Sequence, residues 1–369
     1  MTRAIAAPPS PTRPPPVVVA GLGNIGSQVA DLLVGLGLRS VHFVDPDRYE
    51  ASNVGHQRVR ERDVGRPKAR VQARYLRSLA PGLSVTPWVR SVEAVPAGYL
   101  RGAVILACVD SRWARQAINH LAFALGSPWI DAAIEARGLI KVRGFQPGGP
   151  CLECGWGQED YAALEQRYPC QPGPAVTART NAPAELGAAA AAIQVALLRG
   201  LLAGADPDAL TAQWCLDLAH RHAFAARFEV NPRCLHDHRP WAIAPLAAGA
   251  AALTLGAAFA LVSADGPASL SVDGQVFVRR TRCLRCGHLG RSGLRLSERA
   301  PIRACPACGG PLRATGADVI DALVRARIPG AWLGQPLAAF GFEEHDIFAV
   351  TGGDGEIRCF ELGAAEGSG

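Results

Sequence analysis

Three glycines near the N-terminus have the spacing of a loop that holds phosphate groups. Gly21, Gly23 and Gly26 follow the apolar run 17–20 and open a stretch with apolar residues at helical spacing. In such a loop, backbone amides and the helix N-terminus face the phosphate, and the absent side chains allow its close approach. Asp45 follows the next apolar run, where a carboxylate can accept hydrogen bonds from ribose hydroxyls. These four residues predict a nucleotide site, and they fit an NAD-dependent oxidoreductase equally well.

The residues after Asp45 carry more groups that suit phosphates than a dehydrogenase needs. The stretch 44–57 is unusually polar, and Lys68, one of two lysines in the chain, opens a later helix. A lysine ammonium is a compact charge suited to triphosphate oxygens. Asp110 ends another apolar run, where a carboxylate can hold magnesium together with substrate phosphates. The alternative is that Asp110 or Ser111 only caps the helix that follows.

Cysteine pairs form a second kind of motif. Four cysteines in the C-terminal part have the spacing of a zinc ribbon, namely Cys283, Cys286, Cys305 and Cys308. Both pairs are followed by glycine, which lets backbone amides turn toward the thiolates. The arginines beside them allow another interpretation, in which the ribbon binds nucleic acid or the whole protein is a non-catalytic zinc-ribbon scaffold.

The elements that position these residues follow from the apolar pattern. Short apolar runs alternate with helical segments, which is typical of a doubly wound, mostly parallel α/β sheet with helices on both faces. The expected strands are 17–20, 40–44, 84–89, 103–108, 129–132, 139–145, 213–218 and 224–230. The expected helices are 24–36, 66–79, 112–125 and 184–202. This pattern predicts a domain at 17–240, preceded by a flexible Pro-rich tail at 1–16.

A second domain is expected at 241–369. The uncharged stretch 241–264 is as long as a membrane span, but it is rich in Ala and Gly and contains Pro245, so we interpret it as a linker followed by a buried helix. The ribbon follows, and then a small α+β tail with a helix near 319–327 and strands at 346–350 and 357–362. No membrane association is expected for this domain.

Composition bounds the class of protein. Hydrophobic residues make up 49% and charged residues 19% of the chain, a balance that excludes a largely disordered protein. The net charge of +6 comes almost wholly from scattered arginine, which argues against nucleic-acid binding. The tail at 1–16 lacks the apolar core of a secretory signal, and the eleven cysteines then suggest a reducing compartment, so a cytoplasmic protein is expected.

Taken together, the motifs resemble the ThiF/MoeB superfamily, which includes the ubiquitin-activating enzymes. The resemblance covers about 17–238 and rests on the order of the motifs, which runs through the glycine loop, Asp45-x-Asp47, Asn53-x-x-x-Gln57, Gly65-x-Pro67-Lys68, Asp110 with Arg115 and Asn119, Cys151-x-x-Cys154, and 181–187 leading to Gln194. It implies a ThiF-type Rossmann-like fold that binds ATP and magnesium. It also implies adenylation of the C-terminal carboxylate of a ubiquitin-like (β-grasp) or sulfur-carrier protein, by a homodimer.

The resemblance also assigns roles to residues. ATP would be bound by Gly21, Gly23, Gly26, Asp45, Asp47, Asn53, Gln57, Lys68, Asp110, Ser111 and Arg115. Lys68 and Asp110 would act in the reaction, together with an arginine. Because the family has Arg-Gln where this chain has His56-Gln57, that arginine is expected at Arg58, or alternatively at Arg60.

Two further roles depend on residues far from the glycine loop. Cys170 lies in a loop where related activating enzymes carry the cysteine that takes the acyl group as a thioester, before a downstream conjugating enzyme receives it. The alternative is an inert loop cysteine. Relatives also commonly close a structural zinc site with a second cysteine pair. Here a Cys3His set is expected, formed by Cys151, Cys154, Cys234 and His238, with His236 as the alternative to His238.

Overall fold

The computed structural model describes residues 14–135, 137–165, 182–206, 210–290, 295–296, 305–310, 312–314 and 319–364. The chain divides into two compact units. The first unit comprises the residues up to Val89 and Gly102–Arg239, and the second comprises Arg90–Arg101 and the residues from Pro240 onward. The domain bounds expected from the sequence place 90–101 in the larger domain, and here this short segment groups with the C-terminal residues instead.

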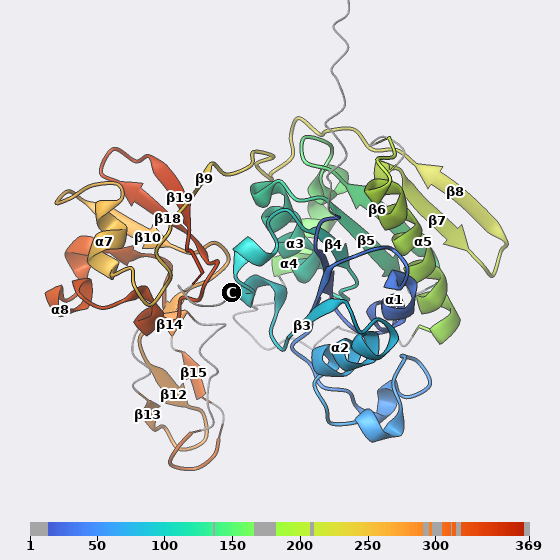
Figure 1. The fold of residues 1–369 in the computed structure, drawn as a ribbon, viewed down its shortest axis with the longest axis horizontal. Coiled ribbons are helices and arrows are strands. Elements are labelled where there is room, and N and C mark those ends of the chain that lie inside the picture. The colour runs from blue at the N-terminus through green and yellow to red at the C-terminus, as the bar shows by residue number, and fades with distance from the viewer. Residues whose placement is uncertain are drawn as a thin grey trace, which may run out of the picture. The chain divides into compact units, whose positions relative to one another are not determined.

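An eight-stranded sheet forms the centre of the first unit (Figure 1). Its strands are β1 (Val17–Ala20), β2 (Ser40–Val44), β3 (Ser84–Trp88), β4 (Val104–Ala107), β5 (Trp129–Ile134), β6 (Ile140–Phe145), β7 (Gln213–Asp217) and β8 (His222–Ala226). They are ordered β3-β2-β1-β4-β5-β6-β7-β8, the first five parallel and the last three antiparallel. The mostly parallel α/β fold expected from the sequence is therefore confirmed.

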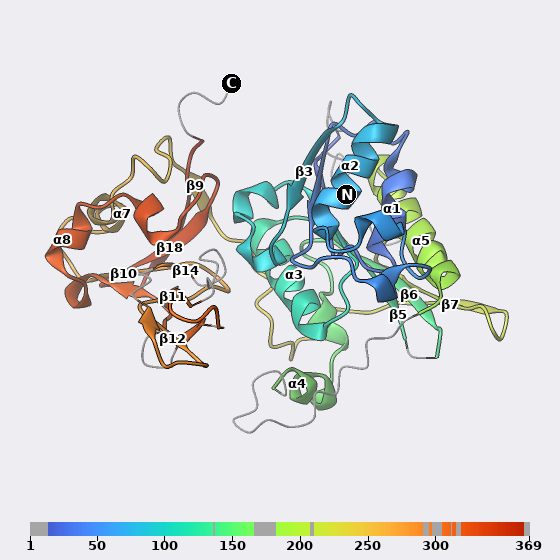
Figure 2. The ribbon, with the colours of Figure 1, turned by 90° about the horizontal axis from the view of Figure 1, so that it is seen from below.

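Helices cover both faces of this sheet. One face is covered by α1 (Gly26–Leu33), α2 (Lys68–Leu79) and α5 (Ala184–Leu202), and the other by α3 (Arg112–Leu125), as Figures 1 and 2 show. A shorter helix, α4 (Gln158–Glu165), follows later in the chain. The core on the first face consists largely of small and branched side chains. β1 contributes Val17 and Val19, and α5 contributes Ala190, Ala191, Val195 and Leu198.

Short 3-10 turns connect several of these elements. In the first unit they are η1 (Ala51–Asn53), η2 (Glu61–Asp63) and η5 (Leu152–Gly155), and in the second η3 (Val92–Ala94), η4 (Ala97–Tyr99), η7 (Arg325–Arg327) and η8 (Leu337–Phe340). Among the described residues, α5 is the one helix long and apolar enough to cross a membrane by length and composition. A third of this apolar stretch is buried in the first unit, where Ala190, Ala191, Val195 and Leu198 belong to the core.

The second unit is built on a five-stranded sheet of order β17-β10-β18-β19-β9 (Figure 1). The strands are β9 (Ile243–Pro245), β10 (Ala268–Ser271), β17 (Leu323–Val324), β18 (Ile347–Gly352) and β19 (Ile357–Glu361), with helices α7 (Leu255–Ala260) and α8 (Gly330–Leu333). Two three-stranded sheets adjoin it. They comprise β11 (Phe277–Val278), β14 (Arg295–Leu296) and β16 (Val319–Ile320), and β12 (Thr281–Cys283), β13 (Leu289–Gly290) and β15 (Leu312–Ala314).

The segment 90–101 is an integral part of the second unit. The Gly98 amide donates a hydrogen bond to the His345 carbonyl at 2.8 Å, and Gln275 Nε2 donates to the Glu93 carbonyl at 2.8 Å. Arg90 forms an ion pair with Glu343 at 2.8 Å. The chain therefore leaves the first unit after β3, contributes this segment to the second unit, and returns at β4.

The helix expected near 319–327 is wrong. This segment forms the short strands β16 and β17, which pair with β11 and β10, and ends in η7. The segment is too short to be a stable helix alone and contains the β-branched residues Val319, Ile320 and Val324, which fit a pleated surface. Pairing with strands distant in sequence therefore outweighs local helical spacing.

Candidate functional site

The glycine loop between β1 and α1 is packed so tightly that two of its glycines admit no side chain. A Cβ atom on Gly21, whose φ is +86°, would lie 2.6 Å from the Cys108 carbonyl oxygen, and one on Gly26 would lie 1.9 Å from the Gly21 carbonyl oxygen. Gly23 differs, because its Cβ would meet nothing closer than Gln57 Nε2 at 3.9 Å. Gly21 and Gly26 therefore shape the loop, whereas the backbone at Gly23 is open to an approaching phosphate.

Asp45 joins the glycine loop to the polar stretch after β2. One carboxylate oxygen accepts a hydrogen bond from the Leu22 amide at 2.7 Å, and the other accepts from the Asp47 amide at 2.8 Å. Burial raises the pKa of Asp45, against the opposing effects of the Lys68 charge and of these two amides. Each oxygen retains a lone pair for a further donor such as a ribose hydroxyl.

Lys68 lies at the start of α2, where its side chain is held by a neighbour of Asp45. Its Nζ forms an ion pair with Asp47 Oδ2 at 3.1 Å, and the lysine side chain is 11% exposed. Gln57 Oε1 is buried and has no hydrogen-bond partner, whereas Asn53 Oδ1 accepts from the Glu50 amide at 2.9 Å. The structure thus groups Asp45, Asp47 and Lys68, and gives Asn53 a local task within η1.

Arg58 has other partners than the glycine loop. It forms an ion pair with Asp31 on α1, donates from Nη2 to the Tyr75 hydroxyl at 2.7 Å, and lies over the Tyr75 ring. The alternative, Arg60, is exposed at the start of η2. Arg58 therefore joins α1 to α2, which leaves Arg60 more available for a ligand.

At the carboxyl end of β4, three expected residues have three different surroundings. Asp110 is exposed. Ser111 caps α3, because its hydroxyl accepts the Ala114 amide at 3.1 Å. Arg115 donates from Nη2 to the Val109 carbonyl at 2.7 Å and from Nε to Asp131 Oδ1 at 2.9 Å. The capping alternative therefore applies to Ser111, and Arg115 fixes the strand ends, which leaves the Asp110 carboxylate at the edge of the sheet.

Helix α5 holds this edge from the other side. Gln194 Nε2 donates to the carbonyls of Ala107 at 3.1 Å and Ile130 at 2.8 Å, and so ties the end of β4 to the neighbouring strand β5 near its start. Asn24, next to Gly23, donates to the Ala182 carbonyl at 2.6 Å before α5 begins. Sequence reasoning missed the role of Asn24. The signal was a polar residue inside a glycine loop, where the side chain has few local partners.

Four side chains far apart in the sequence form the first cysteine cluster, which consists of Cys151, Cys154, Cys234 and His238. Their ligand atoms all lie within 4.8 Å of one another. Cys151 Sγ is 3.6 Å from Cys234 Sγ, and Cys154 Sγ is 3.6 Å from His238 Nε2. Sulfur atoms on a zinc tetrahedron are about 3.8 Å apart, given zinc–sulfur bonds of about 2.3 Å. The donor set and its spacing fit a tetrahedral metal ion.

Glu153, between the first two cysteines, supports this cluster. Its buried carboxylate accepts hydrogen bonds from Gln116 at 3.2 Å and from the Tyr161 hydroxyl at 3.1 Å, and lies 2.6 Å from His120 Nε2. Burial alone would raise the pKa of Glu153, but these hydrogen bonds, that of His120 above all, hold it below its usual value. A buried carboxylate between two ligand positions could not be expected from the sequence.

The two candidate histidines lie in different places. His238 is in the cluster, whereas the ring of His236 stacks on His120 with 4.5 Å between centroids. Burial, together with the charge of His120, lowers the pKa of His236 to about 4. His236 is therefore a neutral packing residue at neutral pH, and the geometry favours His238 as the ligand.

The second cysteine cluster consists of Cys283, Cys286, Cys305 and Cys308. The first of these ends β12, the second follows three residues later, and the last two precede β15. The sulfur atoms of Cys283 and Cys308 are 3.5 Å apart, and those of Cys286 and Cys305 are 3.6 Å apart. Gly287 and Gly309 have φ angles of +73° and +68°, so they turn the backbone after each pair. This cluster also can hold a metal ion. Cys170, by contrast, lies outside the described residues.

The comparisons with known proteins agree with the fold. The model of the ThiF family matches residues 15–213. The adenylyltransferase and sulfurtransferase UBA4 of Yarrowia lipolytica is 31% identical over 143 residues, which cover 37% of this chain and 35% of the relative. The sulfur carrier protein ThiS adenylyltransferase of Escherichia coli is 30% identical over 146 residues, which cover 38% of this chain and 57% of the relative.

The match to these curated relatives therefore spans 35% and 57% of their lengths. A crystal structure of E. coli MccB with ATP covers 60% of this chain and 66% of its own, with 21% identity and a TM-score of 0.48. The family model matches the part of the chain that holds the glycine loop.

Proposed function

Because the chain belongs to the ThiF family, we propose that it adenylates the C-terminal carboxylate of a ubiquitin-like or sulfur-carrier protein, with ATP as co-substrate. The observation that carries the proposal is the grouping of open glycine backbone, Asp45 and Lys68 at the carboxyl edge of one sheet, with Asp110 three residues after the end of β4. The relatives support it, since both are named as adenylyltransferases and one is named for the carrier ThiS.

In the proposed reaction, a carboxylate oxygen of the partner attacks the α-phosphorus of ATP. An oxygen–phosphorus bond forms, and the bond to the β-phosphate oxygen breaks, so pyrophosphate leaves. No general base is needed, because the attacking carboxylate is ionised at neutral pH. The chain's task is to place charges, which is how most phosphoryl and nucleotidyl transfer is accelerated.

Each grouped residue has a task in this proposal. Asp45 would accept the ribose hydroxyls, and the open amides near Gly23 would face phosphate oxygens. Lys68, positioned by Asp47, would neutralise charge on the phosphates, together with Gln57 and an arginine, Arg58 or Arg60. Bound magnesium would screen the phosphate charge, and the exposed carboxylate of Asp110 would hold it. Ser111 and Arg115 would act indirectly, through the cap of α3 and the end of β4.

Further features of the proposal concern the partner and the second step. The partner is a β-grasp protein. The Cys170 sulfur attacks the acyl carbon of the adenylate, a thioester forms and AMP leaves, and a conjugating enzyme receives the acyl group next. We propose a cytoplasmic homodimer, with one zinc ion in each cysteine cluster. The second cluster would form a zinc ribbon that offers a platform for a protein partner.

ATP–pyrophosphate exchange tests the first step. With the purified chain and a candidate ubiquitin-like partner, exchange should appear and should be lost in Lys68→Ala and in Asp110→Ala. Arg70→Ala removes an exposed cation from the same helix as Lys68 and serves as the control, with exchange retained. An oxidoreductase would instead turn over a nicotinamide cofactor, and a scaffold would do neither, so either of those results would replace the proposal.

The second step has its own test. Cys170→Ala should keep exchange but lose the conjugate with the partner that thiols release. Cys215→Ala is the control, because that cysteine is buried in β7. A conjugate that survives in Cys170→Ala would show that another group is the acceptor.

A further inference from the structure

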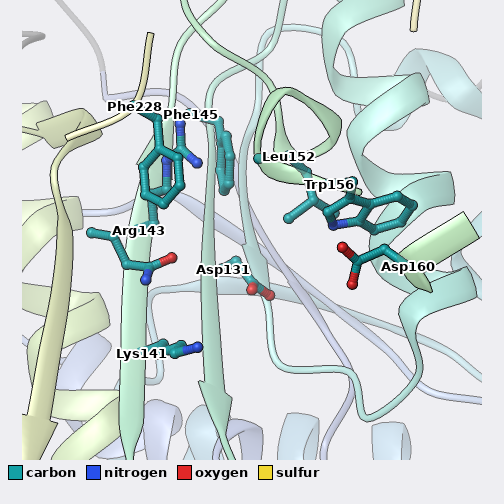
Figure 3. A pocket seen from close by; sticks show the side chains of 10 residues that line it. Asp131, Lys141, Arg143, Phe145, Leu152, Trp156, Asp160 and Phe228 are labelled. Carbon is teal, nitrogen blue, oxygen red and sulfur yellow. The ribbon is translucent and has the colours of Figure 1, made fainter. Parts of the chain in front are cut away.

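A cavity of about 230 Å³ lies in the first unit, beside the antiparallel strands β5 and β6. Its lining includes Asp131, Lys141, Arg143, Phe145, Trp156 and Phe228 (Figure 3). The volume suits one side chain or a small molecule. Adenylation as proposed above assigns no task to this cavity.

Arg143 is the feature that gives the cavity a chemical character. The residue is 4% exposed, and its Nε and Nη2 atoms are buried and have no hydrogen-bond partner. Its guanidinium carbon lies 4.6 Å from the centre of the Phe145 ring and 4.0 Å from that of Phe228. Figure 3 shows the guanidinium between the two rings. A buried cation with unmade hydrogen bonds costs free energy, unless a ligand completes them.

Negative groups lie around Arg143, but none of them accepts a hydrogen bond from its Nε or Nη2. Asp131 is its direct neighbour across the β5–β6 pairing, but Asp131 Oδ1 already accepts from Arg115 Nε at 2.9 Å. Two arginines thus share one carboxylate. The other charged residues of the lining are paired elsewhere, Lys141 with Glu135 and Asp160 with Arg112. Cys151 and Cys154, which would be thiolates in a zinc site, also lie near Arg143, but its Nε and Nη2 are hydrogen-bonded to neither sulfur.

The geometry favours a carboxylate as the missing group. Nε and Nη2 form the edge of a guanidinium that binds a carboxylate through two parallel hydrogen bonds. With Phe145 and Phe228 on two sides of the guanidinium, its Nε–Nη2 edge suits a planar carboxylate better than a tetrahedral phosphate. The cavity also neighbours the proposed reaction site, since Asp131 is paired in register with Ala107, three residues before Asp110.

We propose that Arg143 binds the carboxylate of an acidic side chain in the C-terminal segment of the protein partner, set back from the reacting terminus. The partner's identity as an adenylated protein rests on the function proposed above. Arg143 then selects partners, because a segment without an acid at that position leaves the guanidinium unpaired.

Calorimetric titration with short synthetic peptides tests this inference without ATP. The peptides end in Gly-Gly and carry one glutamate, moved stepwise back from the terminus, or glutamine at the same position. For one position, the glutamate peptide should bind wild type about tenfold more tightly or better than its glutamine counterpart. Arg143→Met keeps an unbranched apolar stem between the rings and should abolish this preference. Arg137→Met removes an exposed arginine between the same strands and should preserve it.

The outcomes separate this inference from the proposed function. If glutamate gives no advantage at any position, or if the advantage persists in Arg143→Met, the inference is overturned, whatever exchange shows. If inorganic phosphate binds in an Arg143-dependent manner and no glutamate peptide does, the site is for a free anion and the inference also fails. Absence of exchange in wild type would overturn the adenylation proposal alone. With exchange present, Arg143→Met should raise the KM for an acidic-tailed partner about tenfold and leave kcat intact.

Discussion

The two cysteine clusters close over very different lengths of chain. In the first cluster, the contacts Cys151–Cys234 and Cys154–His238 join residues that are 83 and 84 positions apart in the sequence. In the second cluster, the contacts Cys283–Cys308 and Cys286–Cys305 join residues that are 25 and 19 positions apart. Closing the longer loop costs about 1 kcal/mol more in chain entropy. A metal ion in the first cluster therefore stabilises the fold of a whole unit, and one in the second stabilises a local turn.

The surroundings of the clusters differ in the same sense. The first is supported by side chains from other elements, with Glu153 receiving hydrogen bonds from α3 and α4. The second is supported by its own backbone, since the Arg285 and Cys286 amides donate to Cys283 Sγ at 3.4 and 3.5 Å. The first cluster depends on the tertiary fold and contributes to it, whereas the second can form from a short sequence alone. Four substitutions or pairs of substitutions can break or sharpen this contrast.

The largest effect is expected from removing one thiolate in each cluster. Cys151→Ser should lower the free energy of unfolding of the first unit by several kcal/mol, because structural zinc sites contribute folding free energy directly. Cys286→Ser should leave the melting of the first unit unchanged. Calorimetry combined with zinc analysis checks this, with about two zinc ions per chain in wild type and one in each variant. Equal destabilisation of the first unit by both variants would refute the contrast.

The two histidines near the first cluster should behave differently. His238→Ala should remove the zinc from this cluster and destabilise the unit nearly as much as Cys151→Ser does. His236→Ala removes a stacked ring next to His120 and should cost about 1 to 2 kcal/mol with the zinc retained. Zinc content distinguishes the two, and loss of zinc in His236→Ala instead would exchange their roles.

Glu153→Gln tests the side-chain support of the first cluster through its pH dependence. The pKa of Glu153 is held low in the folded state, so its contribution is fully present above the unfolded pKa and is lost as pH falls through the folded pKa. At neutral pH the variant should be about 1 to 3 kcal/mol less stable than wild type. The difference should shrink below a pH of about 4.5. Comparing the two proteins at each pH removes the shared effect of protonated ligands, and a difference that stays constant would contradict this account.

The smallest effect is expected from the backbone of the second cluster. Gly309 has a φ of +68°, so Gly309→Ala should cost about 1 kcal/mol through the left-handed conformation. Zinc in this cluster should be released more readily to a chelator, while zinc in the first cluster is unaffected. Gly157→Ala, beside the first cluster but with open space around it, is the matched control and should change neither.

The contrast also explains how much the sequence could predict. The bounds of α3 and α5, and the strands β1 and β2, follow from short-range patterns and agree with the structure. The spacing of the second cluster is equally local. The helix expected at 319–327 failed because its strands find partners at β10 and β11, far away in the chain.

Interactions between distant elements could not be predicted in the same way. Arg58 directly follows Gln57 in sequence, yet its side chain is bound by Asp31 on α1 and Tyr75 on α2. Glu153 stands in a cysteine pair where an exposed side chain would be expected, and it is buried by α3 and α4. Arg143 occupies a buried position on β6. That its Nε and Nη2 lack hydrogen-bond partners can be recognised only from the structure.

The excursion of residues 90–101 into the second unit has a consequence for how this protein can be divided. The polypeptide passes between the units at Val89, at Arg101 and again at Arg239. Cutting the chain at Pro240 therefore separates the second unit from its segment 90–101. A fragment that ends at Pro240 would contain residues 90–101 without their hydrogen-bonding neighbours. The complementary fragment would lack this segment beside Gln275 and His345. The coding sequences of the two units thus alternate along the gene. Neither unit can be exchanged for a foreign domain by a single fusion at Pro240.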